Sequence, residues 1–216
     1  QPKFLGLALF IATNVALSAI TARRKGQNDR EAANRTMLFV LGFVLVAGII
    51  VSAIAVIFAD TFIRLAGSKP DTHEAAVLYF RIIMGGIIFN ALSMGINAAQ
   101  RGAGNTKIAM RTNLISNLVN VIGNYLLIQG HFGFPALGIH GAALATVFGT
   151  VVACVMSILS LMKKDIFVSI PYIVKEKIKP ALEPLTSIVK VGYSVFIEQI
   201  LMRIGFMSTA MMAAKM

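Results

Sequence analysis

The sequence predicts an all-α, polytopic transmembrane helical bundle with six spans. Hydrophobic residues make up 57% of the 216 residues and charged residues only 13%, and the mean hydropathy is +0.79. Because a soluble domain carries about 25% charged residues, this deficit indicates a lipid environment. Lipid offers backbone groups no hydrogen-bond partners, so spans are helices or closed barrels, and barrel-type alternation is missing. The runs without Asp, Glu, Lys or Arg are 4–22, 36–59, 82–100 and 112–162.

The charge-free runs divide into spans in chain order. An apolar helix of roughly 20 residues crosses about 30 Å of hydrocarbon, so each of the first three runs crosses once. The last run is too long for one crossing. Three glycines and a proline within 130–138 break it into two helices joined by a tight turn. A sixth span starts near Val191 and ends near Ala214.

Two loop segments carry the pattern of a helix start. Asn28 precedes Glu31 by three residues, and Asp71 precedes Glu74 by the same spacing. A capping side chain followed three residues later by Glu is typical of a capping box. Because an apolar run follows each, we expect short amphipathic lead-ins before the second and third spans, with Asn28 and Asp71 as the N-caps.

Basic residues collect in alternate loops, which predicts the orientation of the chain. The loops after the first, third and fifth spans hold fourteen, and the opposite loops hold three. Because cytoplasmic loops retain Lys and Arg, we place the larger group in the cytoplasm. The chain then starts outside, so we expect at least one helix upstream and an excerpt from a larger protein. The fourteen are Arg23, Arg24, Lys25, Arg30, Arg35, Arg101, Lys107, Arg111, Lys163, Lys164, Lys175, Lys177, Lys179 and Lys190, and the three are Arg64, Lys69 and Arg81.

Segment 163–190 differs from the other loops. It is long and basic and contains Pro171, Pro180 and Pro184. It is predicted to be a partly helical cytoplasmic connector, either near anionic headgroups or as a plain linker. The net charge of +11 comes largely from such loops, so no nucleic-acid partner is predicted.

The sequence offers no recognisable site for catalysis or for a structural metal. The single Cys154 lies within a span, which excludes an internal disulfide and a cysteine-based metal site. None of the three His residues has ligand spacing, and no Ser/His/Asp set or paired-carboxylate site is recognisable. Segment 100–107 lacks the spacing of a phosphate-binding loop. We therefore expect no cofactor and no enzyme.

Glu198 is the one acidic residue predicted to lie well inside a span. Ionisable groups at bilayer depth are expensive, so they indicate function by default. This carboxylate is a candidate to exchange a proton or to bind Na⁺. The alternative is a structural pair with another helix or with Arg203, which lies about 140° further round the helix.

The fourth span carries a stripe of four asparagines: Asn113, Asn117, Asn120 and Asn124. Their offsets place them on one face of a helix. Amides facing lipid would be unsatisfied, so the stripe faces protein or a water-filled cavity. Hydrogen bonding between helices is the structural alternative. With the polar residues of other spans, the stripe predicts one polar cavity shared by several helices. Those other residues are Asn14, Ser18, Thr21, Asn90, Ser93, Asn97, Thr146 and Thr150.

Several stretches together resemble the multidrug and toxic compound extrusion (MATE) family. They are 22–32, 99–107, 120–130, 134–146 and 197–203. The second is similar to the family's arginine–glycine turn between its fourth and fifth helices, and the fourth is the most distinctive. Their order and spacing match across nearly the whole chain.

The resemblance implies helices two to seven of a twelve-helix, two-lobe antiporter. On this mapping, 1–162 supplies five helices of the first lobe, 163–190 the cytoplasmic inter-lobe connector, and 191–216 a truncated first helix of the second lobe. Such proteins perform secondary active efflux of cationic, lipophilic compounds, with Na⁺ or H⁺ as the coupling ion. We expect a multi-pass protein of the plasma (inner) membrane of a prokaryote. Its expected partners are the bilayer, the transported compounds and the rest of the same polypeptide.

The family's site residues are partly matched. Asn120 and Thr146 match polar positions that line the first-lobe cation site in some members. Asn124 stands where those members have Asp, and Asn does not titrate. Glu198 lies on the helix that carries a coupling Glu in some members, about one turn earlier. The resemblance implies cavity or coupling roles for these residues, with transient Na⁺ at Glu198 or Asn120. Asn90 and Asn14 are candidate cavity residues because they are polar positions inside the predicted spans.

Two other functions stay open at this point. A lipid-linked-precursor flippase of the same superfamily would present several cations to a pyrophosphate, whereas Arg203 is the one clear cation inside a predicted span. A non-transporting membrane scaffold would tolerate alanine at Asn120, Asn124 and Glu198 together.

Overall fold

The computed structural model describes residues 2–65, 68, 70–133, 135–163, 165–179 and 184–213, with side chains from Phe10 to Met202. Within these residues every regular element is a helix, as predicted. Lys69, Lys164, Ala214 and the side chain of Arg203 lie outside the described part. The elements are α1 (Pro2–Gly26), α2 (Arg30–Ile57), α3 (Ala59–Leu65), α4 (Pro70–Gly85), α5 (Ile87–Gly102), α6 (Thr106–Gln129), the 3₁₀ turn η1 (His131–Gly133), α7 (Ile139–Leu161), α8 (Ile170–Lys175) and α9 (Pro184–Ala213).

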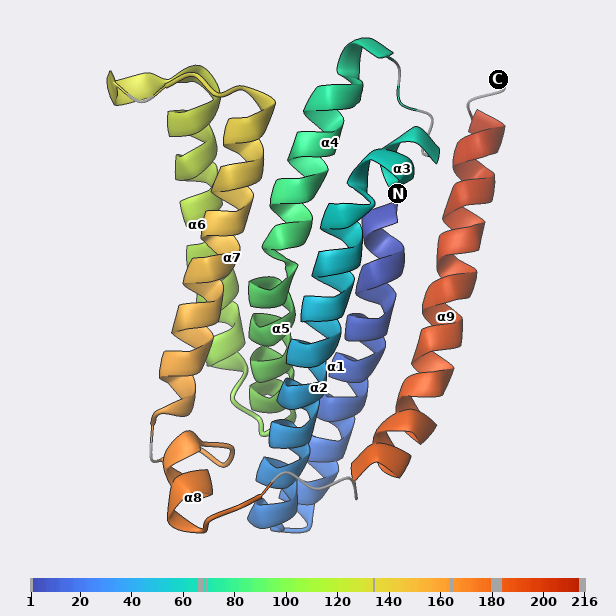
Figure 1. Cartoon of the computed structure of the whole chain (residues 1–216). Coiled ribbons are helices and arrows are strands. Elements are labelled where there is room, and N and C mark those ends of the chain that lie inside the picture. The colour runs from blue at the N-terminus through green and yellow to red at the C-terminus, as the bar shows by residue number, and fades with distance from the viewer. Residues whose placement is uncertain are drawn as a thin grey trace.

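The long helices run side by side as a bundle (Figure 1). Helices α6 and α7 form a pair on one side, α9 lies on the other, and α1, α2 and α5 lie between them. Among the described residues, α2, α7 and α9 as far as Met202 are long and apolar enough to cross a membrane. The bent pair α4–α5 meets the same criteria when its two helices are taken together as one span. Helices α1 and α6 have 25 and 24 residues, which is enough length to cross about 30 Å.

The third predicted span is bent rather than straight. Helix α4 ends at Gly85, α5 begins at Ile87, and the two axes differ by 40°. Paired small residues are a common cause of such kinks. A Cβ on Gly86 would lie 2.8 Å from both γ carbons of Val147, so glycine also lets the bend approach α7. The expected lead-in after Asp71 is part of α4 itself, and Asp71 is not its N-cap, because the helix already begins at Pro70.

The start of the second span differs from the prediction by one residue. Asp29, not Asn28, caps α2, and its Oδ1 accepts a hydrogen bond from the backbone N–H of Ala32 at 3.0 Å. Asn28 has φ 54°, the left-handed conformation that Asn tolerates better than most residues. Because Asn28 makes the turn, the capping position falls on the next residue.

The connector is partly helical, and α2 fixes its first half in place. Arg30 donates hydrogen bonds to the carbonyl oxygens of Ile166 (2.7 Å) and Phe167 (2.9 Å), and its guanidinium lies 4.1 Å from the ring centroid of Tyr172. Asn34, which is fully buried, accepts a hydrogen bond from the N–H of Ser169 at 2.9 Å.

After the connector, α9 begins at Pro184, seven residues before the predicted start at Val191. Proline suits the first turn of a helix. Lys190, predicted to lie in the connector, is an exposed residue of α9.

Opposite the connector, a Ser–His–Asp strap joins α3 to α4. Nε2 of His73 lies 2.8 Å from Oδ1 of Asp60, and Nδ1 lies 2.6 Å from Oγ of Ser68. Arg64 pairs with the other carboxylate oxygen of Asp60 at 2.9 Å. The sequence reading recognised no such set, because the three residues carry no hydrolase motif and meet only through the turn between the two helices.

The strap predicts an acid-sensitive contribution to stability. The His73 hydrogen bond, assisted by Arg64, holds the pKa of Asp60 below its ordinary value of 3.8. A lowered carboxyl pKa stabilises the fold above 3.8, and this stabilisation disappears as the pH falls through the folded-state pKa. Asp60→Asn should therefore reduce the loss of melting temperature on acidification, whereas Glu74→Gln, an exposed carboxylate on α4, should leave it unchanged. Equal acid profiles for wild type and Asp60→Asn would contradict this role.

Candidate cation and substrate cavities

Close packing of α6 against α7 brings the asparagine stripe to a neighbouring helix. A Cβ on Gly149 would lie 3.0 Å from the carbonyl oxygen of Ser116, so the two backbones approach closely only because this position is glycine. The Ser116 hydroxyl donates a hydrogen bond to the Gly149 carbonyl at 2.8 Å. This contact sets the register that places Asn120 beside Thr146.

Asn124, Asn120 and Thr146 form a chain of hydrogen bonds. Nδ2 of Asn124 donates to Oδ1 of Asn120 at 3.1 Å, and Nδ2 of Asn120 donates to Oγ1 of Thr146 at 3.1 Å. The Thr146 hydroxyl donates in turn to the Ala142 carbonyl at 2.9 Å. Oδ1 of Asn124 is buried and has no partner among the described residues. An unsatisfied buried acceptor is costly, which makes this oxygen a position for a cation or a water.

A small cavity lies beside this chain, at the bend between α4 and α5. Its volume is about 60 Å³, and its polar lining residues are Asn90, Thr146 and Thr150. A cavity of this size holds a few waters or a partly hydrated ion, whereas drug-sized ligands need about 300 Å³ or more. The structure thus brings Asn90, Asn120, Asn124 and Thr146 together around α5, α6 and α7.

The other half of the stripe does not join this group. Asn113 and Asn117 are exposed on α6.

Asn14 lies elsewhere, at the contact between α1 and α5. It is 3% exposed, and neither side-chain polar atom has a partner among the described residues. Its Oδ1 lies 3.5 Å from the position of a Cβ on Gly95 of α5. A third group, Ser93, Asn97 and Ser157, is linked by hydrogen bonds of 3.0–3.4 Å between α5 and α7. The predicted polar residues therefore do not all share one cavity: Asn90, Thr146 and Thr150 line one together, and helix packing places the others in separate groups.

Glu198 is exposed on α9 and is not brought to the asparagine group. Helix α9 packs on α1 and α2. Glu198 is two residues beyond Phe196, about 200° round the helix, so it lies on the face of α9 turned away from these neighbours. Its predicted structural partner Arg203 has no described side chain.

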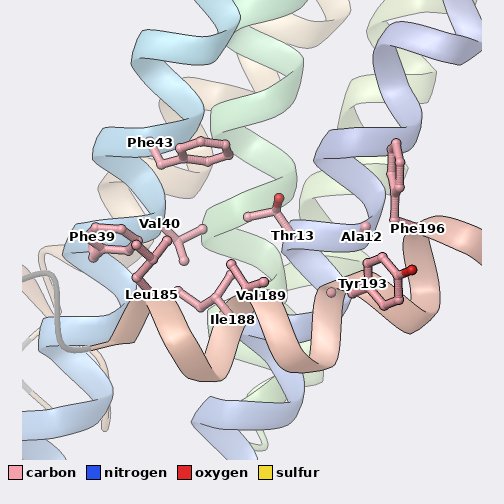
Figure 2. A pocket seen from close by; sticks show the side chains of 11 residues that line it. Ala12, Thr13, Phe39, Val40, Phe43, Leu185, Ile188, Val189, Tyr193 and Phe196 are labelled. Carbon is pink, nitrogen blue, oxygen red and sulfur yellow. The ribbon is translucent and has the colours of Figure 1, made fainter.

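A larger, apolar cavity lies between α9 and the first two helices (Figure 2). Its volume is about 240 Å³. Phe39 and Phe43 come from α2, and Tyr193 and Phe196 come from α9, with Ala12 and Thr13 on α1 (Figure 2). Sequence reasoning missed this cavity, because its residues are ordinary membrane-helix residues from three separate segments.

The sequence of this chain is similar to those of known multidrug resistance proteins. The family model described as MatE matches residues 3–126. The chain is 26% identical over 202 residues to the probable multidrug resistance protein YoeA of Bacillus subtilis, covering 94% of this chain and 44% of the relative. It is 29% identical over 145 residues to the multidrug resistance protein PmpM of Pseudomonas aeruginosa, covering 67% and 30%. The chain therefore spans less than half the length of these relatives.

Solved structures agree with the sequence match. An inward-facing MATE family transporter superposes with a TM-score of 0.83 at 27% identity, covering 94% of this chain and 45% of that one. An outward-facing MATE transporter superposes with a TM-score of 0.84 at 26% identity, covering 95% and 45%. The helices, their packing and the family match over more than half of the sequence lead to one assignment: this chain belongs to the MatE family of multidrug efflux transporters.

Proposed function

We propose that this chain forms the first lobe, and the first helix of the second lobe, of a secondary active multidrug exporter. The exporter exchanges Na⁺ or H⁺ for cationic, lipophilic compounds by alternating access of a cavity between two lobes. Support comes from relatives named as multidrug resistance proteins and from transporters of the family captured facing inward and outward. The basic end of the bundle, which carries α8, faces the cytoplasm of a prokaryotic cell.

The observation that supports a cation-binding site is the unpartnered Oδ1 of Asn124, at the end of the hydrogen-bonded chain of Asn124, Asn120 and Thr146. Amide and hydroxyl oxygens are hard, neutral ligands that suit an alkali cation and do not take up a proton at neutral pH. Na⁺ at Asn124, Asn120 and Thr146 would satisfy the orphan oxygen. The adjacent 60 Å³ cavity at Asn90 would hold the water that accompanies the ion.

The apolar cavity between α1, α2 and α9 is the proposed site for the lipophilic part of the substrate. Its four aromatic side chains suit flat apolar molecules, and aromatic faces also attract a cationic group. At about 240 Å³ it approaches drug size, unlike the polar cavity. This proposed substrate site is separate from the proposed Na⁺ site at the asparagines.

Replacing Asn124 by leucine tests the cation site. Leucine has the same number of side-chain heavy atoms as Asn but no oxygen, so Na⁺ loses a ligand. Purified wild-type protein should melt at a higher temperature in Na⁺ than in K⁺, with a gain of about 1.4 kcal/mol at ten times the dissociation constant. Asn124→Leu should lose this gain.

Asn117→Leu is the matched control, since it makes the same change at an exposed position of the same helix. It should keep the Na⁺ effect. Retention of the effect in Asn124→Leu, or its equal loss in both variants, would contradict Na⁺ binding at this site. A wild-type protein indifferent to Na⁺ would do the same.

The two alternatives give different results in transport assays. A scaffold would be unaffected when Asn120, Asn124 and Glu198 are all replaced by alanine and expression is maintained. A flippase would move a lipid-linked pyrophosphate instead of a cationic dye. The apolar lining of the cavity between α1, α2 and α9 favours the exporter over the flippase.

A further inference from the structure

A third cavity lies between α1 and α9 at the basic end of the bundle. Its volume is about 460 Å³, the largest of the three described above. Both helices have their basic ends there: α1 finishes at Gly26, and α9 starts at Pro184 near the connector (Figure 1). The lining residues are Ala19, Ile20, Arg23, Arg24, Ser187, Lys190 and Val191.

The charges around this cavity are mostly uncompensated. Arg23 and Lys190 are exposed and have no ion pair among the described residues. Arg24 pairs with Asp29 through one terminal nitrogen at 3.2 Å, which leaves the rest of its guanidinium available. Ser187 adds an exposed hydroxyl donor. Three cations and a hydroxyl around one cavity are the donors that a phosphate group requires.

The cavity changes from charged to apolar along the helices. Ala19 and Ile20 lie one turn before Arg23 and Arg24 on α1, further from the end of the helix. They form an apolar wall together with Val191 of α9. A free inorganic anion gains nothing from such a wall, and it is much smaller than the cavity. An amphiphile with a phosphate headgroup and an acyl chain matches both parts.

We propose that this cavity binds the headgroup of an anionic phospholipid, with the phosphate at Arg23, Arg24 and Lys190 and the start of an acyl chain against Ala19 and Ile20. The bound lipid bridges α1 and α9, and it thereby holds α9 against the first lobe at the basic end. This site goes beyond the proposed exchange of cation and drug, and it does not depend on the coupling ion. Lipid composition would then set how readily α9 separates from α1.

Native mass spectrometry of the protein in neutral detergent tests the site, with phosphatidylglycerol, phosphatidylcholine and inorganic phosphate as separate probes. The variant Arg23→Gln/Arg24→Gln/Lys190→Gln should bind phosphatidylglycerol at least about tenfold more weakly, since each basic residue adds to attraction for an anionic headgroup. Phosphatidylcholine binding should change little. Inorganic phosphate should not displace phosphatidylglycerol from the wild type.

A control variant distinguishes lipid binding in this cavity from non-specific attraction to the basic surface. Lys107→Gln/Arg111→Gln/Lys175→Gln removes the same charge from exposed positions at the same end of the bundle and should keep phosphatidylglycerol affinity within about twofold. Equal weakening in both variants, or no weakening in the cavity variant, would overturn the proposal. Displacement by inorganic phosphate would overturn the choice of lipid.

A variant that keeps the three charges tests whether the glutamine variant loses lipid because of lost charge or because of misfolding. Arg23→Lys/Arg24→Lys/Lys190→Arg keeps all three charges and should keep most of the phosphatidylglycerol binding. If this variant binds as poorly as the glutamine variant, headgroup charge is not the cause and the proposal is wrong.

Discussion

Gly141→Ala is expected to lower the melting temperature of the protein, while the same substitution at Gly42 raises it. A Cβ on Gly141 would lie 2.3 Å from the carbonyl oxygen and 2.6 Å from the carbonyl carbon of Leu127. These are backbone atoms of α6, so no side chain can rotate away to make room. The Leu127 carbonyl also accepts the hydrogen bond of the Leu137 N–H at 2.9 Å, which anchors the turn between α6 and α7.

The expected destabilisation is about 1–3 kcal/mol, the usual result of forcing extra volume into a packed contact. Helices α6 and α7 must then separate at this end or shift in register. Either change moves Thr146 relative to Asn120, so the Na⁺ effect on stability should weaken as well.

Gly42 is the matched control. It lies within α2, is exposed, and has no atom within 4 Å of a built Cβ. Alanine there stabilises the helix by about 0.5–1 kcal/mol, because glycine loses more backbone entropy on folding. The measurement is the fraction of monodisperse protein remaining after heating in detergent. Equal stability of the two variants would show that α6 and α7 do not pack as described.

Much of the fold follows from local patterns in the sequence. Long charge-free runs mark the helices of this bundle, because lipid leaves the backbone few alternatives to a helix. The bend at Gly86 could not be placed the same way. Glycine is common in straight membrane helices, and the bend depends on contact with Val147, a residue distant in sequence. The start of α9 at Pro184 was also missed, because basic residues such as Lys190 can extend from a helix end into water.

The candidate site was predictable only in part. The spacing of Asn120 and Asn124 placed them on one helix face, and the structure joins them by a hydrogen bond. Spacing along one helix cannot say which neighbour that face meets, so Asn14 was grouped wrongly with them. Contacts between segments distant in the chain were not predicted at all. Arg30, counted only as a loop cation, in fact holds the connector through two carbonyl oxygens.

In the full-length protein, Glu198→Gln is expected to abolish gradient-driven efflux, the largest functional effect that we predict. Pro184–Met202 of α9 is long and apolar enough to span a membrane, and we expect Glu198 to lie at bilayer depth. A carboxylate there cannot face lipid without a large penalty. Its face of α9 is turned away from α1 and α2. On the exporter proposal, that face meets the second lobe. We expect Glu198 to exchange its proton or Na⁺ for the cationic substrate.

The control for Glu198→Gln is the same substitution at a carboxylate outside the predicted spans' interior. Glu74→Gln makes the same substitution at an exposed residue of α4, outside the proposed cavities. It should leave efflux close to that of the wild type. Glu198→Gln should still bind dye in the apolar cavity, because that cavity is lined by other residues.

The most direct test of the exporter proposal is dye efflux from proteoliposomes under an imposed Na⁺ or proton gradient. The full-length wild-type protein and its Glu74→Gln variant should export dye only while the gradient is present, and full-length Glu198→Gln should be as inactive as liposomes without protein. Undiminished efflux by Glu198→Gln, or wild-type efflux that ignores both gradients, would contradict cation-coupled export by this protein.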